Sequence, residues 1–573
     1  MAAVRPLAHD ARGVARAMDQ QTQPLILALD CGTTSVRVIV FEGDFARASA
    51  QREFTQFFPA PGLVEHDAEE IWTALLACMK DAVASAELRA QDVSAIGITN
   101  QRETIVVWDR ATGRPIHRAI VWQDRRTAPV MDALRAAGHE ERVREATGLT
   151  LDPYFSASKL AWILDAVDGA RARAERGELA AGTIDSWVLW NLTKGRTHAT
   201  DASNASRTML ARIGGPNGAA WDDALCELFH VPRAVLPEIV DSAGELGVVD
   251  ASILDASILD ASILDASILD ASILEASNRA AAIPVTGIAG DQQSALFGQG
   301  AHAMGDAKCT FGTGCFLLAN AGETKPAPPK GLLATVAWRI AGRTMYAVEG
   351  SVFVGGSAVQ WLRDGLQFFE RAVEVNALAA SVSDSGGVVV VPAFAGLGAP
   401  HWDASARGAI LGLTRGATRA HIARATLEGV AHEVVDLIDA IRAGGVELHA
   451  LRVDGGAAAS DFLMQSCADF SQLAMERPKT LETTALGAAR LARVGFARVG
   501  LARVGLAQVG LAETTLAPVP AQRQKGDILS AVSTIPGGLD RRFEPVLGAA
   551  ELGRARARWN RAVDTVRFFG SPA

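Results

Sequence analysis

The chain has 573 residues, which is more than one hydrophobic core usually supports, so two or more domains are expected. Apolar residues make up 49% of the chain and charged residues 21%, which is typical of a soluble globular protein. The net charge of −9 argues against nucleic acid as the main partner, and the apolar runs are too short and too rich in glycine to span a membrane.

The cysteines are scattered along the chain and form no C-x-x-C pair. This spacing suits a reducing compartment and argues against structural zinc, so we expect a cytoplasmic protein. Residues 1–24 contain three arginines together with Asp10 and Asp19, and they lack the apolar stretch of a signal peptide. We predict a flexible tail there, with a targeting segment as the alternative.

The first predicted element is a hairpin in LILALDCGTTSVRVIVFE, residues 25–42. Apolar residues precede the turn and β-branched residues follow it, as in two antiparallel strands. The turn holds one acid, one glycine and three hydroxyl groups in a row, and Arg37 follows. Turn N–H groups, hydroxyls and an arginine can bind phosphate oxygens together, so the turn is a candidate for one side of a polyphosphate site.

Two tracts repeat with a period of five residues. Residues 250–274 are DASIL five times over, and residues 491–510 read LARVG, FARVG, LARVG, LAQVG. A repeat of this length gives no single apolar face on a helix, and so few copies cannot stack into a β-helix. We interpret the first tract as an expansion at a surface site, and we expect the second to lengthen a surface helix or loop in the second domain.

A second hairpin is predicted in AKCTFGTGCFLLAN, residues 307–320, again with a tight Gly/Thr turn between two strands. Taken singly, either hairpin could be an ordinary Thr/Gly turn. Two similar hairpins, one at the start of each half, suggest two related domains that face each other and share a nucleotide. The remaining segments alternate between strand-like and helix-like patterns, which indicates an α/β fold with a domain break near residues 298–302.

Long ordered stretches resemble the FGGY family of carbohydrate kinases, and within it the members that phosphorylate glycerol. The shared stretches include ALDCGTTSVRVIVFE, PGLVEHDAEEIW, IGITNQRETIVVWDR, AIVWQDRRT, LDPYFSASKL, TDASNASRTML, GIAGDQQSALFGQ, FGTGCFLL, VEGSVFVGGSAVQWLRD and LRVDGGAAASDFLMQ. The resemblance implies two actin-like (ribonuclease-H-like) domains with ATP in the cleft between them. It also implies MgATP-dependent phosphorylation of a terminal glycerol hydroxyl, giving sn-glycerol 3-phosphate and ADP.

The implied domains follow the two hairpins. Residues 1–24 are the tail, residues 25–299 the N-terminal kinase domain with the DASIL tract, and residues 300–573 the C-terminal kinase domain with the LARVG tract. The regulatory loop of some bacterial relatives falls where the DASIL tract lies. The resemblance does not extend across this tract, so the regulation of those relatives is not carried over to this chain. For the oligomeric state the expectation is a homodimer or a homotetramer.

The resemblance assigns Asp291, in GIAGDQQ, as the general base that accepts the proton of the substrate hydroxyl. A carboxylate at this strand-to-helix junction could instead be a helix N-cap. Gln292 beside it resembles a ligand of a glycerol hydroxyl. Arg102 and Glu103, in NQRET, match a clamp that offers a triol both donors and acceptors, whereas the simpler interpretation is a surface salt bridge.

Three aromatic residues complete the implied glycerol site. Tyr154 matches a hydroxyl ligand, and Trp122 and Phe316 match the walls against which the carbon chain packs. Packing in a hydrophobic core is the alternative for Trp122 and Phe316.

The implied nucleotide site draws on both halves of the chain. Its residues are Thr33, Thr34, Ser35 and Arg37 on the first hairpin, Thr313 on the second, Gly356 and Gln360 near the ribose and phosphates, and Gly456 and Ser460 at the adenine pocket. Ser460 stands where relatives carry Asn, and a hydroxyl replaces an amide only in part. Asp30 resembles the acid that orients Mg²⁺ through water, since magnesium keeps several waters and needs few carboxylates.

Two other functions were weighed. A pentulose or gluconate kinase would share the hairpins and the base but usually lacks NQRET and DPYF together. A catalytically silent nucleotide-binding regulator on the same fold would be expected to lack Asp291 or the Arg102–Glu103 pair. Both features are present in the sequence.

Overall fold

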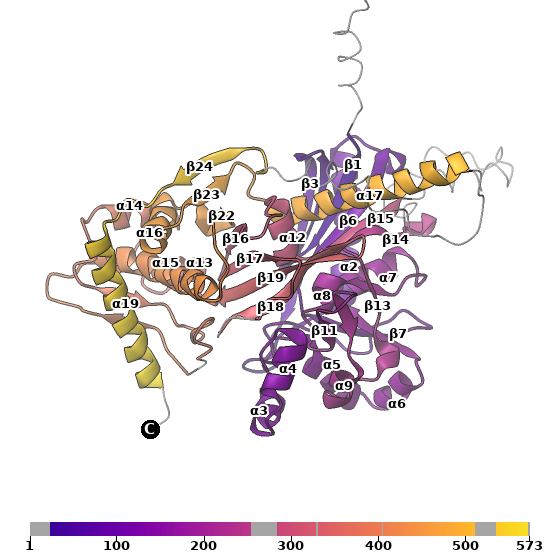
Figure 1. Ribbon diagram of the computed structural model, residues 1–573, viewed down its shortest axis with the longest axis horizontal. Coiled ribbons are helices and arrows are strands. Elements are labelled where there is room, and N and C mark those ends of the chain that lie inside the picture. The colour runs from indigo at the N-terminus through magenta and orange to yellow at the C-terminus, as the bar shows by residue number, and fades with distance from the viewer. Residues whose placement is uncertain (1–22, 254–282, 328–330, 404, 510–534, 571–573) are drawn as a thin grey trace, which may run out of the picture.

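The computed structural model describes residues 23–253, 283–327, 331–403, 405–509 and 535–570. It has two lobes that share one 13-stranded sheet, whose strand order is β24-β23-β22-β16-β17-β19-β18-β14-β15-β6-β1-β2-β3. In Figure 1 the first half of the chain forms one lobe and most of the second half forms the other, while β17, β18 and β19 run between them. The predicted α/β fold class is confirmed.

The elements of the first half are β1 (Leu25–Cys31), β2 (Ser35–Glu42), β3 (Phe45–Glu53), β4 (Gln56–Phe57), β5 (Glu65–His66), α2 (Ala68–Ser85), β6 (Val93–Asn100), β7 (Ile105–Asp109), β8 (Ala119–Ile120), α3 (Ala128–Ala136), α4 (Glu140–Thr147), α5 (Ser156–Ala166), α6 (Ala170–Glu175), β9 (Leu179–Thr183), α7 (Ile184–Leu192), β10 (Ala199–Asp201), α8 (Ala202–Ala205), β11 (Ala211–Ile213), β12 (Ala219–Trp221), α9 (Asp223–Leu228), β13 (Glu238–Val240), β14 (Ala243–Val248), β15 (Pro284–Gly290) and α12 (Asp291–Gly298).

The elements of the second half are β16 (Ala307–Phe311), β17 (Cys315–Gly322), β18 (Leu333–Ile340), β19 (Arg343–Val352), α13 (Gly356–Asp364), α14 (Glu374–Ala380), β20 (Val389–Val391), β21 (Ala409–Leu411), α15 (Arg419–Ala443), β22 (Leu451–Asp454), α16 (Asp461–Ser471), β23 (Met475–Pro478), α17 (Thr483–Val509), β24 (Leu539–Phe543) and α19 (Ala549–Gly570).

The same strand arrangement occurs in both halves. In the first, β2 pairs antiparallel with β1 and β3, while β6 pairs parallel with β1 and β15. In the second, β17 pairs antiparallel with β16 and β19, while β22 pairs parallel with β16 and β23. Both predicted hairpins are therefore present and equivalent. The prediction of two related domains agrees with this repeat, and the boundary at residues 299 and 300 stays a prediction.

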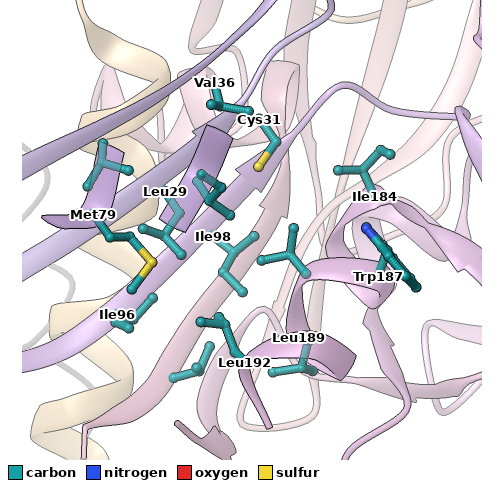
Figure 2. Packing of buried hydrophobic residues seen from close by; sticks show 14 of the residues in the cluster. Leu29, Cys31, Val36, Met79, Ile96, Ile98, Ile184, Trp187, Leu189 and Leu192 are labelled. Atoms are coloured by element: carbon teal, nitrogen blue, oxygen red, sulfur yellow. The ribbon is translucent and has the colours of Figure 1, made fainter. Parts of the chain in front are cut away.

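A hydrophobic core lies between the first-half strands of the large sheet and helices α2 and α7. Figure 2 shows side chains from β1, β2, β6, α2 and α7 pointing toward one another, among them Leu29, Ile98, Met79 and Trp187. Helix α2 starts at an N-cap, Asp67, which accepts hydrogen bonds from the first-turn N–H groups. This packing fixes the carboxyl ends of β1 and β6, where the chemistry-bearing residues follow.

Helix α17 belongs to the second half in sequence, yet its first part packs on the sheet of the first half (Figure 1). Glycines allow the close approach: a Cβ atom on Gly97 would lie 2.2 Å from the carbonyl oxygen of Ala488, and one on Gly487 would lie 1.8 Å from that of Ser294. The LARVG tract begins inside this helix, so it is helical through Val509. Of the DASIL tract, residues 254–274 lie outside the described residues, as do residues 1–22 of the tail.

Candidate active site

The first hairpin presents a tight polar turn at the lobe interface. The N–H group of Gly32 donates to the carbonyl oxygen of Ser35 at 3.0 Å, and the Thr33 hydroxyl accepts from the indole N–H of Trp122 at 3.0 Å. Arg37 donates to Gln51 at 2.7 and 2.9 Å and pairs with Glu482, which precedes α17. The arginine thus already bridges the hairpin to the second half of the chain, and Thr34 is exposed at the tip.

The second hairpin packs against the start of α13. The N–H group of Gly355 donates to the carbonyl oxygen of Thr313 at 2.7 Å, and that of Gly356 donates to Gly312 at 2.8 Å. A Cβ atom on Gly356 would lie 2.8 Å from the Gly312 oxygen, so glycine is needed for this contact. Thr313 and Gln360 are both exposed. The turn of the second hairpin and the start of α13 therefore lie side by side.

The two residues predicted for the adenine pocket differ in surroundings. A Cβ atom added to Gly456 would meet no heavy atom within 4 Å, so the space above this glycine is open. The Ser460 hydroxyl instead already makes hydrogen bonds within the protein. It accepts from the N–H group of Leu463 at 3.1 Å, which caps α16, and it donates to the side-chain oxygen of Asn376. The open space suits a flat base, whereas the Ser460 hydroxyl is engaged in holding the helix.

Asp291 follows β15 and is the first residue of α12, with Gly290 at the N-cap position. Its Oδ1 atom lies 3.2 Å from Nε of Arg102 and accepts from the N–H group of Gln292 at 2.7 Å. The side chain is 29% exposed, so the carboxylate is reachable. Burial raises the pKa of the Asp291 carboxyl, while Arg102 and the Gln292 N–H group lower it. A carboxylate with a raised pKa in a site of this kind is suited to accept a proton.

Arg102 and Glu103 do not form a surface salt bridge, because their side chains are only 2% and 1% exposed. Arg102 donates to both carboxylate oxygens of Glu349, at 2.7 and 2.8 Å. Glu103 has a positive φ of 61° and accepts from Arg207 at 2.7 Å. Since buried charges are costly unless they are paired, these ion pairs are what allow the two residues to lie inside the protein.

Trp122, Tyr154 and Phe316 meet edge to face, with ring centroids 5.5 Å apart for Trp122 and Tyr154 and 6.4 Å apart for Trp122 and Phe316. Trp122 and Phe316 are only partly buried. Core packing alone therefore does not describe these two. Because Trp122 also donates to Thr33, this aromatic group connects the first hairpin to β17 of the second half.

Of the buried charged residues that the sequence analysis did not single out, four contact predicted site residues or their partners. Glu349 and Arg207 complete the ion-pair cluster, Lys308 bonds Gln292 and donates to Thr310 at 2.8 Å, and Lys159 donates to the Tyr154 carbonyl oxygen at 2.7 Å. All four lie within segments that the resemblance covers or adjoins. The available signal was a lone charge inside an apolar stretch, as in YAVEGSVF and AKCTF, where an unpaired charge would be costly.

Asp30 lies at the end of β1 and faces the same region. Burial raises the pKa of its carboxyl to about 7, Arg37 opposes this shift, and the nearby charges of Asp291 and Glu482 add to it. A carboxylate kept among other negative charges is suited to a divalent cation, and oxygen donors are those that Mg²⁺ prefers. The residues present therefore fit a magnesium ion held near Asp30 through water.

Comparison with known proteins gives consistent results along nearly the whole chain. The FGGY family of carbohydrate kinases matches with its N-terminal domain over residues 25–269 and its C-terminal domain over residues 307–496. The glycerol kinase of Rhodopirellula baltica is 51% identical, covering 94% of this chain and 90% of that protein. The glycerol kinase of Trichlorobacter lovleyi is 50% identical, covering 96% and 99%.

Among solved structures, Plasmodium falciparum glycerol kinase with ADP superposes with a TM-score of 0.79 at 32% identity, covering 95% of this chain and 98% of that one. Gluconate kinase from Lactobacillus acidophilus superposes with a TM-score of 0.77 at 18% identity, covering 96% and 98%. At that identity the second likeness concerns the fold alone.

Proposed function

Since the chain belongs to the FGGY family of carbohydrate kinases, we propose that it transfers the γ-phosphoryl group of ATP to glycerol, giving sn-glycerol 3-phosphate and ADP. The resemblance noted in the sequence is confirmed by these matches. Relatives at about 50% identity over nearly their full length carry the name glycerol kinase. The structural observation that supports the substrate is the grouping of Arg102 and Asp291 with the aromatic residues Trp122, Tyr154 and Phe316.

In the proposed reaction, Asp291 accepts the proton of the terminal hydroxyl as that oxygen attacks the γ-phosphorus. The bond between the γ-phosphorus and the β–γ bridging oxygen breaks, and ADP leaves. Arg102, Glu103, Tyr154 and Gln292 orient the hydroxyl groups, because a triol requires donors and acceptors together. The protein mainly positions the reacting groups, as is usual for phosphoryl transfer.

We assign the nucleotide to the two hairpins and to Gly456. The turn of residues 32–35 and the FGTG turn would hold the phosphates, and the open space above Gly456 would receive the base. Mg²⁺ would be held near Asp30 through water, and when bound it neutralises phosphate charge. To reach a phosphate, Arg37 would have to bind it in addition to Gln51 and Glu482. Ser460 would have to contact the nucleotide while its hydroxyl caps α16.

A coupled assay of ADP release tests the proposal. We expect turnover with glycerol to exceed that with pentuloses, gluconate and other polyols by orders of magnitude in kcat/KM. A preference for a pentulose or gluconate would move the chain to another branch of the family. ATP binding without turnover on any acceptor would favour the regulator instead.

We extend the proposal to a cytoplasmic enzyme that assembles as a homodimer or homotetramer. All six cysteines are buried and free, as suits a reducing compartment. Within the described ranges, no helix combines the length and the apolar character needed to cross a membrane. Exposed apolar side chains at the end of α19, Phe568 and Phe569 at 85% and 79%, would suit a contact between subunits. Analytical ultracentrifugation would measure the assembly.

A further inference from the structure

The guanidinium group of Arg102 is held by contacts of two different strengths. Its two terminal nitrogens donate to Glu349 at 2.7 and 2.8 Å, in the fork geometry that is strongest for an arginine and a carboxylate. Its other contacts are longer: 3.2 Å to Gln293, 3.2 Å to Asp291 and 3.5 Å to the Tyr154 hydroxyl. The longer contacts to Asp291 and Tyr154 are the ones that a substrate hydroxyl could replace.

Glu349 comes from the second half of the chain, whereas Arg102 lies two residues after the end of β6 in the first half. In the β17–β19 ladder Glu349 is opposite Leu318, and Ser351 is opposite Phe316. Because residues two apart on a strand share a face, the Glu349 side chain leaves the sheet on the same face as Phe316. The sheet register therefore places this carboxylate on the side where the aromatic group lies.

Glu349 also supplies a negative charge that neutralises the two buried arginines beside it. Both of its neighbours, Arg102 and Arg207, are buried, and Arg207 lies 3.3 Å from Glu349 while it binds Glu103. Without the Glu349 charge, Arg102 would keep only two carboxylates close by, namely Glu103 at 3.8 Å and Asp291 at 3.2 Å. Arg102 would then be drawn toward Asp291 and away from its position beside Tyr154.

We propose that Glu349 is a positioning residue for the acceptor: it holds Arg102 across the two lobes so that Nε and one terminal N–H face the substrate hydroxyls. Arg102 is thereby fixed before the substrate arrives, which lowers the cost of binding. The inference rests on the proposed function, because the acceptor is taken to be glycerol. It assigns to β19 a part in recognising the substrate, beside the residues of the first half and Phe316 of β17.

The direct test is Glu349→Gln, which keeps the shape of the side chain and removes its charge. We expect the KM for glycerol to rise at least about tenfold while the KM for ATP stays within about twofold, because loss of a charge-assisted hydrogen bond acts on the acceptor side alone. Glu433→Gln is the control for replacing a buried glutamate of the second half, since Glu433 belongs to α15 and, unlike Glu349, has a pKa that burial raises. Its KM for glycerol should stay at the wild-type value.

A second variant separates positioning from simple charge balance and covers the case in which Glu349→Gln folds poorly. Glu349→Asp keeps the negative charge but shortens the side chain, so that it no longer reaches both terminal nitrogens of Arg102. If Glu349 only balances charge, the KM for glycerol should stay within about threefold of wild type, and this would overturn the inference. A positioning role predicts a KM raised beyond that range.

The two proposals fail in different ways. A wild-type protein that does not phosphorylate glycerol would refute the proposed function. A wild-type protein that does so, together with an unchanged glycerol KM in Glu349→Gln, would refute only the role of Glu349.

Discussion

The Nε atom of Arg102 lies 3.2 Å from the Oδ1 atom of Asp291. Arg102 follows β6 and Asp291 follows β15, and these two strands are parallel neighbours in the sheet. Because the carboxyl ends of parallel strands meet at one edge, the sheet brings together a cation that can bind hydroxyl groups and a carboxylate that can accept a proton. This juxtaposition places the proposed clamp and the proposed base at a single point.

Replacing Asp291 with Asn should abolish most turnover while both substrates still bind. The amide keeps the shape of the side chain but cannot accept the hydroxyl proton, and loss of a general base usually costs about 10²–10⁴ in rate. Steady-state kinetics would measure kcat, and calorimetry would measure ATP and glycerol binding. Near-normal turnover would remove Asp291 from the role of base.

Glu349 should contribute stability that is lost in acid. Burial alone would raise the pKa of its carboxyl, but Arg102 and Arg207 lower that pKa to about 2, below its usual value. Because the pKa is lower in the folded state, the ionised carboxylate stabilises the folded protein fully at a pH above its unfolded pKa of about 4.5. This contribution disappears as the pH falls toward about 2. It amounts to roughly 3 kcal/mol at neutral pH.

Urea denaturation of wild type and Glu349→Gln between pH 7 and pH 2 would measure this contribution. The difference in unfolding free energy between the two proteins should be constant above about pH 5 and should shrink below it. A difference that does not change with pH would contradict the assigned ion pairs.

Two glycines of the LARVG tract offer a matched pair. A Cβ atom on Gly495 would lie 2.0 Å from the carbonyl oxygen of Thr286, whereas one on Gly500 would meet no heavy atom within 4 Å. Gly495→Ala should therefore destabilise the protein by about 1–3 kcal/mol, because α17 must move away from β15. Gly500→Ala should stabilise it by up to about 1 kcal/mol, since alanine favours an exposed helix. Thermal melts of both variants would test this, and equal effects would argue against the packing of α17.

Ser460 should show its capping role more clearly than a nucleotide role. Ser460→Ala removes the hydroxyl that caps α16 and should cost about 1 kcal/mol of stability. Ser460→Asn keeps a capping group and adds an amide, so stability should be retained and the KM for ATP should fall. If instead Asn raises the KM for ATP, the position is not beside the nucleotide.

The hairpins were predictable because the information is local. Turn residues between apolar strands specify both β1–β2 and β16–β17, and residues 25–42 and 307–320 fold as expected. The strand before Arg102 and the strand-to-helix junction at Asp291 could also be read from short segments. The helix-capping role of Ser460 was not predicted from the sequence. Ser460 was assigned to a nucleotide site from the resemblance, whereas its hydroxyl caps α16.

The partners of the clamp could not be predicted in the same way. Glu349 reaches Arg102 only because β19 pairs with β17 in one register, and Arg207 reaches Glu103 through α8 and the segment after it. Nor does the sequence reveal that α17 lies against the sheet of the other half, where Gly97 and Gly487 allow contact.

The sequence by itself determined the α/β class and the two hairpins, because turn chemistry and hydrophobic periodicity act over a few neighbouring residues, and the site residues were assigned from the resemblance of short segments to the family. Only the tertiary structure decided which charges neutralise one another and which lobe supports each side chain. Burial makes an unpaired charge costly, and a partner can be identified only when distant strands have been placed side by side.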